Sequence, residues 1–548
     1  MTAFGPLDWT IAGIALLLTL FAGLYVRRSV GSLEDYLVAH RGMGLYVGTA
    51  SLVSTEIGII TYAYQAQFGF LAGFSAFVTG LITFVVCLAV GSSGFVISRL
   101  REAGIMTVPE YLERRYASGV RIVAGVLMAV GGSLNLGIFP LIEARFLAIL
   151  TGLDPRHVTW VMAGLLAVAL VYTAVGGMVS LLLTNYVQYV ILATATVVVT
   201  LACLRATSWS AMTAAVHEHL DGRGFDPLTD PDLGIGFILW QLLLWTALMT
   251  VWQSVAMRSF SARDSATGRR VFTLTSVLFL GRAVIPMAWG IAALAFFSAG
   301  APRAPEPTGE RAAQMQELEA TLGRDFRSHV DAGEIGVVLP QVERLSRLAR
   351  ETGSEAHAAS ARERREEIGM VAMPWMLARI LPTGLLGLAL AGLLAASVST
   401  YAGYFLAWSA VIAQDVVGPA LGRELDGRTR LWLTRTCVFG LTVFIAVWSL
   451  VYQVPGPAYF YLQVTANLFM APTLVTIVAG LYWGRASRAG AYLSFALGAG
   501  TSLAYLIPSL QVGVATAGNL SWGLSALGMI AGSLLSPGPA RPPSEVRA

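Results

Sequence analysis

The chain has 548 residues, of which 56% are hydrophobic and only 12% are charged, and its formal net charge at pH 7 is +4. Soluble domains carry about 25% charged residues, so this composition excludes a soluble protein and indicates a polytopic membrane protein. Every basic residue is an arginine. In a membrane protein, an arginine excess is typical of cytoplasmic loops and does not indicate nucleic-acid binding.

Apolar runs follow one another along the chain. A membrane-spanning helix needs about 20 apolar residues, and several runs are long enough for two spans separated by a turn. We therefore expect about thirteen transmembrane helices. The runs are 9–26, 57–98, 122–142, 158–204, 235–257, 271–299, 383–414, 436–484 and 489–540, with turns expected at Gly69–Gly73, Gly176–Gly177, Pro455–Pro457 and Pro508.

The charges around these runs predict the orientation of the chain. Asp8 precedes the first run, and Arg27 and Arg28 follow it, which is the reverse of a cleavable signal peptide and places the N-terminus outside. Alternating spans then place most loop arginines inside, as the positive-inside rule requires. The predicted inner arginines are 27, 28, 41, 99, 101, 114, 115, 121, 258, 263, 269, 270, 423, 428, 430, 435, 485 and 488, whereas the short outer loops hold only Arg156, Arg205 and Arg223.

One long segment, 301–370, is charged instead of apolar. Its apolar residues Val342, Leu345 and Leu348 recur at helical spacing, which predicts short surface helices on the outer face. Two functions stay open for this segment. It is either a solvated cap or a lid that captures substrate.

Four ionisable residues fall within predicted spans, where each costs about 2.5 kcal/mol or more and is a functional candidate. Glu143 and Arg145 lie close to the outer end of their predicted helix, so we expect them to reach the interface or to pair with each other. Glu56 and Arg282 lie deeper in their spans. These two form either a buried structural pair or part of a binding site.

A cluster of small and hydroxyl residues marks the span at 383–414. Ala396, Ser399 and Thr400 stand at positions i, i+3 and i+4, on one face of a helix. Such hydroxyls either bond back to their own helix or offer oxygen atoms to a hard cation such as Na⁺. The sequence pattern alone leaves both alternatives open.

Other functional classes lack support in the sequence. All six histidines lie outside the predicted spans, and we find no HExxH, Walker A or CxxC pattern. The three cysteines lie in apolar stretches, where they are typical packing residues. We therefore expect no enzyme activity, no cofactor and no ATP-driven transport.

Four segments together resemble the sodium/solute symporter family, which includes bacterial sodium/proline and sodium/galactose symporters. They are Ser32–Arg41, Thr107–Tyr116, Gly176–Gln188 and Gly392–Thr400. The resemblance implies an all-α, LeuT-type fold of two inverted five-helix repeats in a multi-pass protein of a bacterial inner membrane. The expected parts are a first helix and loop at 1–43, repeats at 44–204 and 235–482, an outer loop at 205–234, and peripheral helices with a short cytoplasmic tail at 483–548.

The family's discontinuous helices open each repeat and build the site at the middle of the membrane. The stretch 54–58 is a weak point of this kind, whereas 239–252 has no glycine or proline and shows none. By resemblance, backbone carbonyls and hydroxyl groups bind the Na⁺ ion. The residues that match this sodium site are Ser54, Ile57, Ala396, Ser399 and Thr400.

The resemblance also implies contacts to the solute. Glu56 matches a position where the proline symporter has an acid, Arg282 matches a substrate-contacting lysine of the sugar symporter, and Gln463 matches a substrate-contacting glutamine. One departure from the family pattern is Asn185, which replaces the usual aspartate of a Thr-Asp-x-x-Gln motif and weakens the case for a second cation site.

These observations predict a secondary active transporter in which inward Na⁺ flux drives uptake of a small organic solute by alternating access. If Glu56 and Arg282 bind the solute, we expect it to be charged or zwitterionic; if they pair with each other, neutral solutes stay open. The alternative is a sensory receptor of the same fold. The tail after residue 536, about a dozen residues, has no room for a signalling kinase.

Overall fold

The structure is a computed structural model that describes residues 4–26, 32–230, 233–299, 311–421, 425–454, 456–505 and 513–536. These residues are almost entirely helical and contain no β-strand. Within them, nine segments are long and apolar enough to cross a membrane. The all-α, polytopic membrane class is therefore confirmed, while the count of thirteen spans stays a prediction. Arg27, Arg28, Arg423, the expected turns at Pro455 and Pro508, and the tail after 536 lie outside the described residues.

Two of the expected turns divide long apolar runs as predicted. Gly73, with a φ angle of 61°, ends α4 (Ile59–Ala72), and a short 3₁₀ turn leads into α5 (Phe77–Ser93). Gly177, with a φ angle of 55°, breaks α10 (Val158–Ala206) into two parts. Both angles lie in the left-handed region, which glycine enters without strain.

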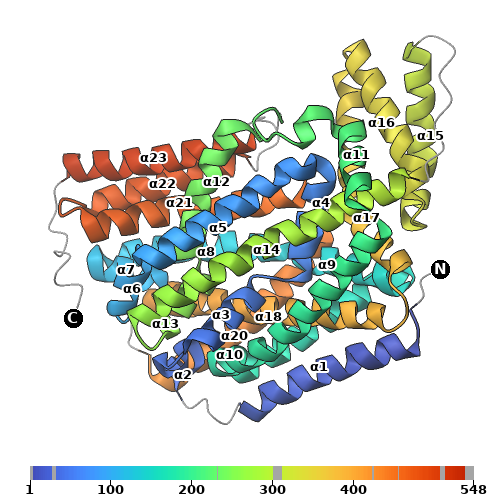
Figure 1. The fold of residues 1–548 in the computed structure, drawn as a ribbon. Helices are drawn as coiled ribbons and strands as arrows, with labels where there is room; N and C mark the ends of the chain where they lie inside the picture. The colour runs from blue at the N-terminus through green and yellow to red at the C-terminus, as the bar shows by residue number, and fades with distance from the viewer. Residues whose placement is uncertain are drawn as a thin grey trace.

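The remaining long helices of the bundle are separate elements. Their bounds are α1 (Pro6–Val26), α8 (Ser118–Gly137), α9 (Phe139–Thr151), α14 (Ser265–Ser298), α18 (Leu385–Val411), α20 (Gly427–Val451), α21 (Ala458–Tyr482), α22 (Arg488–Tyr505) and α23 (Val514–Leu535). Figure 1 shows them lying roughly along one common direction, which becomes the membrane normal when the apolar segments span a bilayer.

Two helices of the bundle are broken in their middle. The chain leaves the helical conformation between α3 (Leu45–Thr55) and α4, where the sequence predicts a weak point. A second break at Trp252 separates α12 (Gly234–Val251) from α13 (Gln253–Ser261), where the sequence shows none. Trp252 has φ −63° and ψ 114°, angles that any residue adopts, so this break needs neither glycine nor proline.

The two ends of the bundle carry different segments, as Figure 1 shows. At the end where α1 begins lie α11 (Trp209–Leu220), α15 (Arg311–Asp331) and α16 (Ile335–Thr352), and His219 of α11 contacts Glu343 of α16 at 2.7 Å. The opposite end carries α6 (Ile97–Glu102), α7 (Val108–Arg115) and α13. Segments predicted to share one side of the membrane therefore share one end of the bundle.

The described part of the cap, 311–370, is helical, but its helices are longer than predicted. Beyond α15 and α16, α17 (Glu355–Ile380) begins in the cap and continues into the bundle, where it packs against α4, α9 and α14. Arg364 of α17 forms an ion pair with Glu319 of α15 at 2.7 Å, and this pairing holds the pKa of the Glu319 carboxyl below its ordinary value.

Three arginines predicted to lie in inner loops are instead embedded among helices. Arg115 is fully buried and donates from Nε to the main-chain oxygen of Gly480 at 2.9 Å. Arg258 is fully buried within α13. Arg121 pairs with the buried Asp415 at 2.7 Å. The prediction of loop positions is wrong for these residues because carbonyls, hydroxyls and carboxylates among the helices accept hydrogen bonds from their guanidinium groups.

Candidate ion and solute site

The break between α3 and α4 leaves main-chain oxygen atoms without their usual partners. The last carbonyls of a helix lack a donor four residues onward, and α3 ends at Thr55. The Gly58 N–H, which would otherwise reach the Ser54 carbonyl, instead donates to the Thr61 hydroxyl at 3.3 Å. The Ser54 carbonyl at the end of α3 therefore lacks its usual helical donor, and Ile57 lies in the break between the two helices.

Helix α18 faces this break with its hydroxyl cluster. Ser54 Oγ donates to Ser399 Oγ at 2.9 Å, so the end of α3 and the middle of α18 touch. Thr400 Oγ1 is buried and has no hydrogen-bond partner among the described residues. A Cβ atom at Gly58 would lie 2.9 Å from Thr400 Oγ1, so glycine keeps the space beside this hydroxyl open.

The five residues predicted to bind Na⁺ are thus brought together by α18 and the break that follows α3. Ala396 is fully buried, one turn before Ser399 and Thr400 on α18. The buried, unpartnered Thr400 oxygen fits a small cation, because a buried hydroxyl without a partner is costly otherwise. The chemistry of the donors, carbonyl and hydroxyl oxygens, suits a hard cation.

Asn185 extends this cluster toward α10. Ser399 Oγ donates to Asn185 Oδ1 at 2.8 Å, and Asn185 Nδ2 donates to Thr55 Oγ1 at 2.9 Å. The Arg258 guanidinium also donates to Thr55 Oγ1. The amide also donates to Ser51, to its Oγ at 3.0 Å, and it shares the Thr55 hydroxyl with a fully buried arginine. Arg258 is a residue of this site that the sequence reading missed, because its neighbours Arg263, Arg269 and Arg270 suggested a loop.

Glu56 lies in the α3–α4 break and is 3% exposed. Its carboxylate accepts hydrogen bonds from Ser254 Oγ at 3.0 Å and from Tyr404 Oη at 2.8 Å. Its main-chain oxygen, not its carboxylate, accepts a hydrogen bond from Arg282 Nε at 2.7 Å. Among the described residues, the hydrogen bond between Glu56 and Arg282 runs through the main chain, while the two charged side chains contact other groups.

Arg282 of α14 is placed by polar and aromatic contacts. Its Nη2 donates to the Tyr64 hydroxyl at 3.2 Å, and its guanidinium lies over the rings of Trp245 and Phe279 at 5.6 Å and 5.3 Å from their centroids. Its Nη1 is buried and unpartnered within the described part of the chain. A buried guanidinium nitrogen without an acceptor is the natural partner of an anionic group.

A small internal cavity connects these residues. Its volume is about 50 Å³, and Glu56, Arg282, Gln463 and Thr400 all line it. The sequence analysis assigned three of these residues to the solute and the fourth to Na⁺, so the structure brings both predicted sites to one cavity. Aromatic side chains supply much of the remaining wall: Tyr64, Phe139, Trp245, Trp252 and Tyr404.

The prediction for Glu143 is wrong. Helix α9 continues about two turns beyond Glu143, to Thr151, and the Glu143 side chain is fully buried. Its Oε1 accepts a hydrogen bond from the Ile60 main-chain N–H at 3.1 Å, and its Oε2 accepts one from Ser397 Oγ. Arg145, by contrast, is exposed. Glu143 therefore places a carboxylate at the positive N-terminal end of α4, beside the proposed ion site.

A polar cluster closes the bundle at the end predicted to be cytoplasmic. Thr107 Oγ1 donates to Asp415 Oδ1 at 2.8 Å, and Arg121 Nε donates to the same oxygen at 2.7 Å. Gln253, next to the α12–α13 break, accepts from the Val108 N–H at 3.0 Å. The sequence reading missed Asp415 because the apolar run was taken to stop at residue 414.

Comparisons with known proteins agree with this architecture. A family model described as "Sodium:solute symporter family" matches residues 36–316 and 351–498. The chain is 22% identical to sodium/glucose cotransporter 4 of Danio rerio over 93% of this chain and 73% of that protein. It is 20% identical to the sodium/glucose cotransporter of Vibrio parahaemolyticus over 89% of this chain and 82% of that protein.

Among solved structures, a Na⁺-coupled sialic acid symporter in a substrate-bound, outward-open state shares the fold with a TM-score of 0.75. The two chains are 14% identical, and the match covers 98% of this chain and 100% of the other. This likeness confirms the LeuT-type fold. Because the family model matches well over half of its residues, the chain belongs to the sodium:solute symporter family.

Proposed function

We propose that this protein is a secondary active transporter that couples inward Na⁺ flux to the uptake of a small organic solute by alternating access. The observation that supports it most directly is the shared cavity, in which Thr400 of the ion cluster and Arg282 of the solute cluster face the same space. An ion and a solute bound this close together stabilise each other's binding, and that mutual stabilisation is what coupling requires.

The ion site in this proposal consists of the carbonyls of Ser54, Ile57 and Ala396 with the hydroxyls of Ser399 and Thr400. Glu143 acts on it from the other side of Gly58, where a Cβ atom would lie 3.4 Å from its carboxylate. The same Cβ atom would lie 2.9 Å from Thr400 Oγ1, so the carboxylate and this hydroxyl flank one space, where a buried negative charge favours a cation. Glu143 also holds the N-terminus of α4 in place through Ile60.

The solute in this proposal carries a carboxylate or a similar anionic group, which Arg282 Nη1 binds. Gln463 offers an amide to the polar part of the solute, and the aromatic wall packs against its apolar part. The Glu56 carboxylate already accepts two hydrogen bonds, so we assign it an electrostatic role in holding the break and the ion.

Alternating access follows from the size of the cavity. At about 50 Å³ it is far smaller than the roughly 300–1,000 Å³ of ordinary ligand pockets, so it is too small for an organic solute. The side chains that line it must move apart to admit a solute. The polar cluster of Thr107, Arg121 and Asp415 then serves as the closed gate on the opposite side.

Na⁺-dependent solute binding tests this proposal in the purified protein. Trp245 and Trp252 line the cavity, so their fluorescence reports its occupation. A panel of amino acids, carboxylates and sugars is titrated with Na⁺ and with choline as the replacement cation. We expect a carboxylate-bearing solute to change the emission only in Na⁺. A response to neutral sugars alone contradicts the role of Arg282, and a response independent of Na⁺ contradicts coupling.

A further inference from the structure

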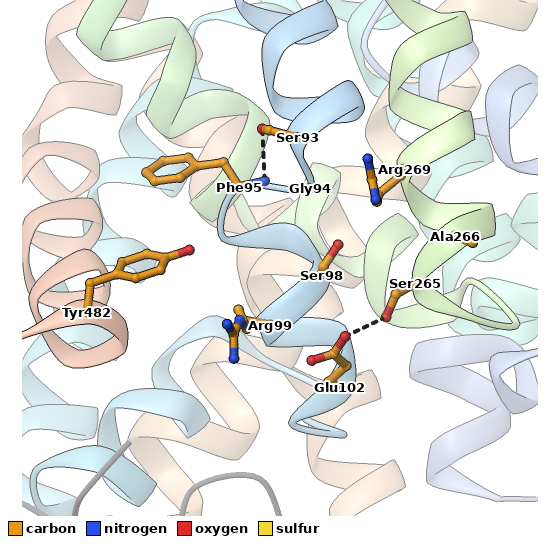
Figure 2. A pocket seen from close by; sticks show the side chains of 10 residues that line it. All are labelled: Ser93, Gly94, Phe95, Ser98, Arg99, Glu102, Ser265, Ala266, Arg269 and Tyr482. Carbon is orange, nitrogen blue, oxygen red and sulfur yellow. Dashed lines mark hydrogen bonds between the residues drawn. The ribbon is translucent and has the colours of Figure 1, made fainter. Parts of the chain in front are cut away.

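A second cavity, of about 450 Å³, lies away from the transport site. It is formed by the end of α5, by α6, by the beginning of α14 and by the last residue of α21, as Figure 2 shows. This end of the bundle carries the loops that the arginine distribution predicts to be cytoplasmic. The cavity is large enough for a small-molecule group, since ligand sites commonly measure about 300–1,000 Å³.

The polar lining of this cavity has a net positive charge. It contains two guanidinium groups, Arg99 and Arg269, and a single carboxylate, Glu102, which accepts a hydrogen bond from Ser265 at 3.4 Å. Arg99 is exposed and makes no hydrogen bond or ion pair with any described residue. The Ser98 hydroxyl oxygen is buried and equally without a partner in the described part of the chain.

The backbone is shaped to bring these groups together. Gly94 has a φ angle of 72°, and a Cβ atom there would lie 2.4 Å from Ser98 Oγ and 3.0 Å from Arg269 Cδ. Arg269 donates to the main-chain oxygens of Ser92 and of Gly91, the latter at 3.4 Å. The Arg269 guanidinium is thus fixed at the rim, whereas the Arg99 guanidinium stays available for a ligand.

The surface that leads away from the cavity is apolar. On α5, the exposed residues Leu81, Val85 and Leu88 precede Ser92 at spacings that keep them on one helical face. On α14, Val277 lies two turns from Arg269 and is 60% exposed. Side chains of this kind face acyl chains when the bundle is in a bilayer. The cavity therefore lies where a polar, positive pocket meets the lipid-facing surface.

We propose that this cavity binds the phosphate headgroup of an anionic phospholipid, whose acyl chains lie along α5 and α14. Arg99 provides the charge that pairs with the phosphate, Ser98 provides a hydroxyl donor, and Arg269 holds the rim. Basic pockets at the cytoplasmic ends of transmembrane helices are suited to such headgroups. The aromatic pair Phe95 and Tyr482, stacked with ring centroids 6.2 Å apart, borders the pocket.

Lipid retention by the full-length protein tests this proposal. The protein is reconstituted into nanodiscs of equal parts phosphatidylglycerol and phosphatidylcholine, extracted in mild detergent, and examined by native mass spectrometry. We expect the wild-type protein to retain phosphatidylglycerol preferentially. Arg99→Gln should lower this preference at least fivefold. Ser93→Trp, which fills the cavity without removing a charge, should lower it to a similar extent.

The matched control is Arg270→Gln, which removes an exposed arginine next to Arg269 that does not line the cavity. We expect this variant to retain lipid like the wild type. Equal losses in Arg99→Gln and Arg270→Gln would show a general surface-charge effect and overturn the site. Inorganic phosphate and glycerol 3-phosphate are added as competitors. Displacement of the lipid by either at millimolar concentration would show a site for soluble anions and contradict the lipid assignment.

Discussion

Arg282 contacts Glu56 through the main chain: its Nε donates to the Glu56 carbonyl oxygen at 2.7 Å, while the Glu56 carboxylate is bonded to Ser254 and Tyr404. The guanidinium therefore stabilises the break between α3 and α4, and the carboxylate connects this break to α13 and α18. One buried acid and one buried base thus connect α13, α14 and α18 to the break without a hydrogen bond between their side chains.

This geometry predicts that neutralising both Glu56 and Arg282 does not restore the uptake that is lost when either one is neutralised. We expect Glu56→Gln and Arg282→Gln each to reduce uptake strongly, by about 10- to 150-fold, the range that corresponds to the 1.5–3 kcal/mol of a hydrogen bond to a charged group. The double variant should be at least as impaired as the worse single variant. Uptake and thermal stability are measured together, and recovery of wild-type uptake in the double variant would show a simple buried pair instead.

The ion site predicts different effects for two adjacent hydroxyls. Thr400→Ala removes an oxygen that has no protein partner, so it should raise the Na⁺ concentration for half-maximal uptake about tenfold, or 1.4 kcal/mol, with little change in stability. Ser399→Ala should change both the Na⁺ dependence of uptake and the stability of the protein, because Ser399 also connects Ser54 to Asn185.

Ser409→Ala on the same helix is the control for both variants. Its hydroxyl is buried but donates to its own helix, at the Leu406 carbonyl. We expect this variant to keep the wild-type Na⁺ dependence. An unchanged Na⁺ dependence in the Ser399→Ala, Thr400→Ala double variant would remove these residues from the ion site.

Glu143 gives a further prediction. Glutamine at this position can keep its amide oxygen on the Ile60 N–H and donate its NH₂ group to the Ser397 hydroxyl, so Glu143→Gln removes mainly the negative charge. We expect a weaker apparent affinity for Na⁺ with little change in stability. Arg145→Gln, two residues onward on the exposed face, should change neither. Similar effects of the two variants would restore the reading in which Glu143 and Arg145 act together.

The orientation of the chain is tested by cysteine labelling. In a background where Cys87, Cys203 and Cys437 are replaced by serine, Ala356→Cys places a thiol on the exposed surface of the cap, and Gly427→Cys places one at the opposite end. An impermeant thiol reagent should label the cap from outside intact cells and label Gly427→Cys only after the membrane is opened. The reverse pattern would invert the topology and the direction of transport.

Local sequence patterns predict the features of this fold that depend on local physics. Apolar run length indicates the helices, and Gly73 and Gly177 mark turns that require a positive φ angle. The hydroxyl spacing on α18 identifies one face of the ion cluster. The weak point at 54–58 coincides with the end of α3 because small and polar residues leave that helix easy to interrupt.

The features that were missed depend on contacts between distant segments. The break at Trp252 has no local signal, since its ring packs against Trp408 and Phe469 and its angles are ordinary. Glu143 and Arg258 were assigned to a helix end and a loop, because their buried partners, Ile60, Ser397 and Thr55, lie at least 83 residues away in the chain. Only the folded bundle shows that the Glu143 carboxylate and the Arg258 guanidinium both lie beside the break between α3 and α4.

Gradient-driven uptake by the purified protein in proteoliposomes tests the central claim most directly. Vesicles are loaded with potassium buffer, and labelled solutes that produced a Na⁺-dependent fluorescence change are supplied outside with either Na⁺ or choline. We predict accumulation above the external concentration only with an inward Na⁺ gradient, collapse of this accumulation when a sodium ionophore is added, and slower accumulation in Thr400→Ala at the same subsaturating Na⁺ concentration. Equal uptake with and without the gradient, or accumulation that survives the ionophore, would contradict sodium-coupled transport.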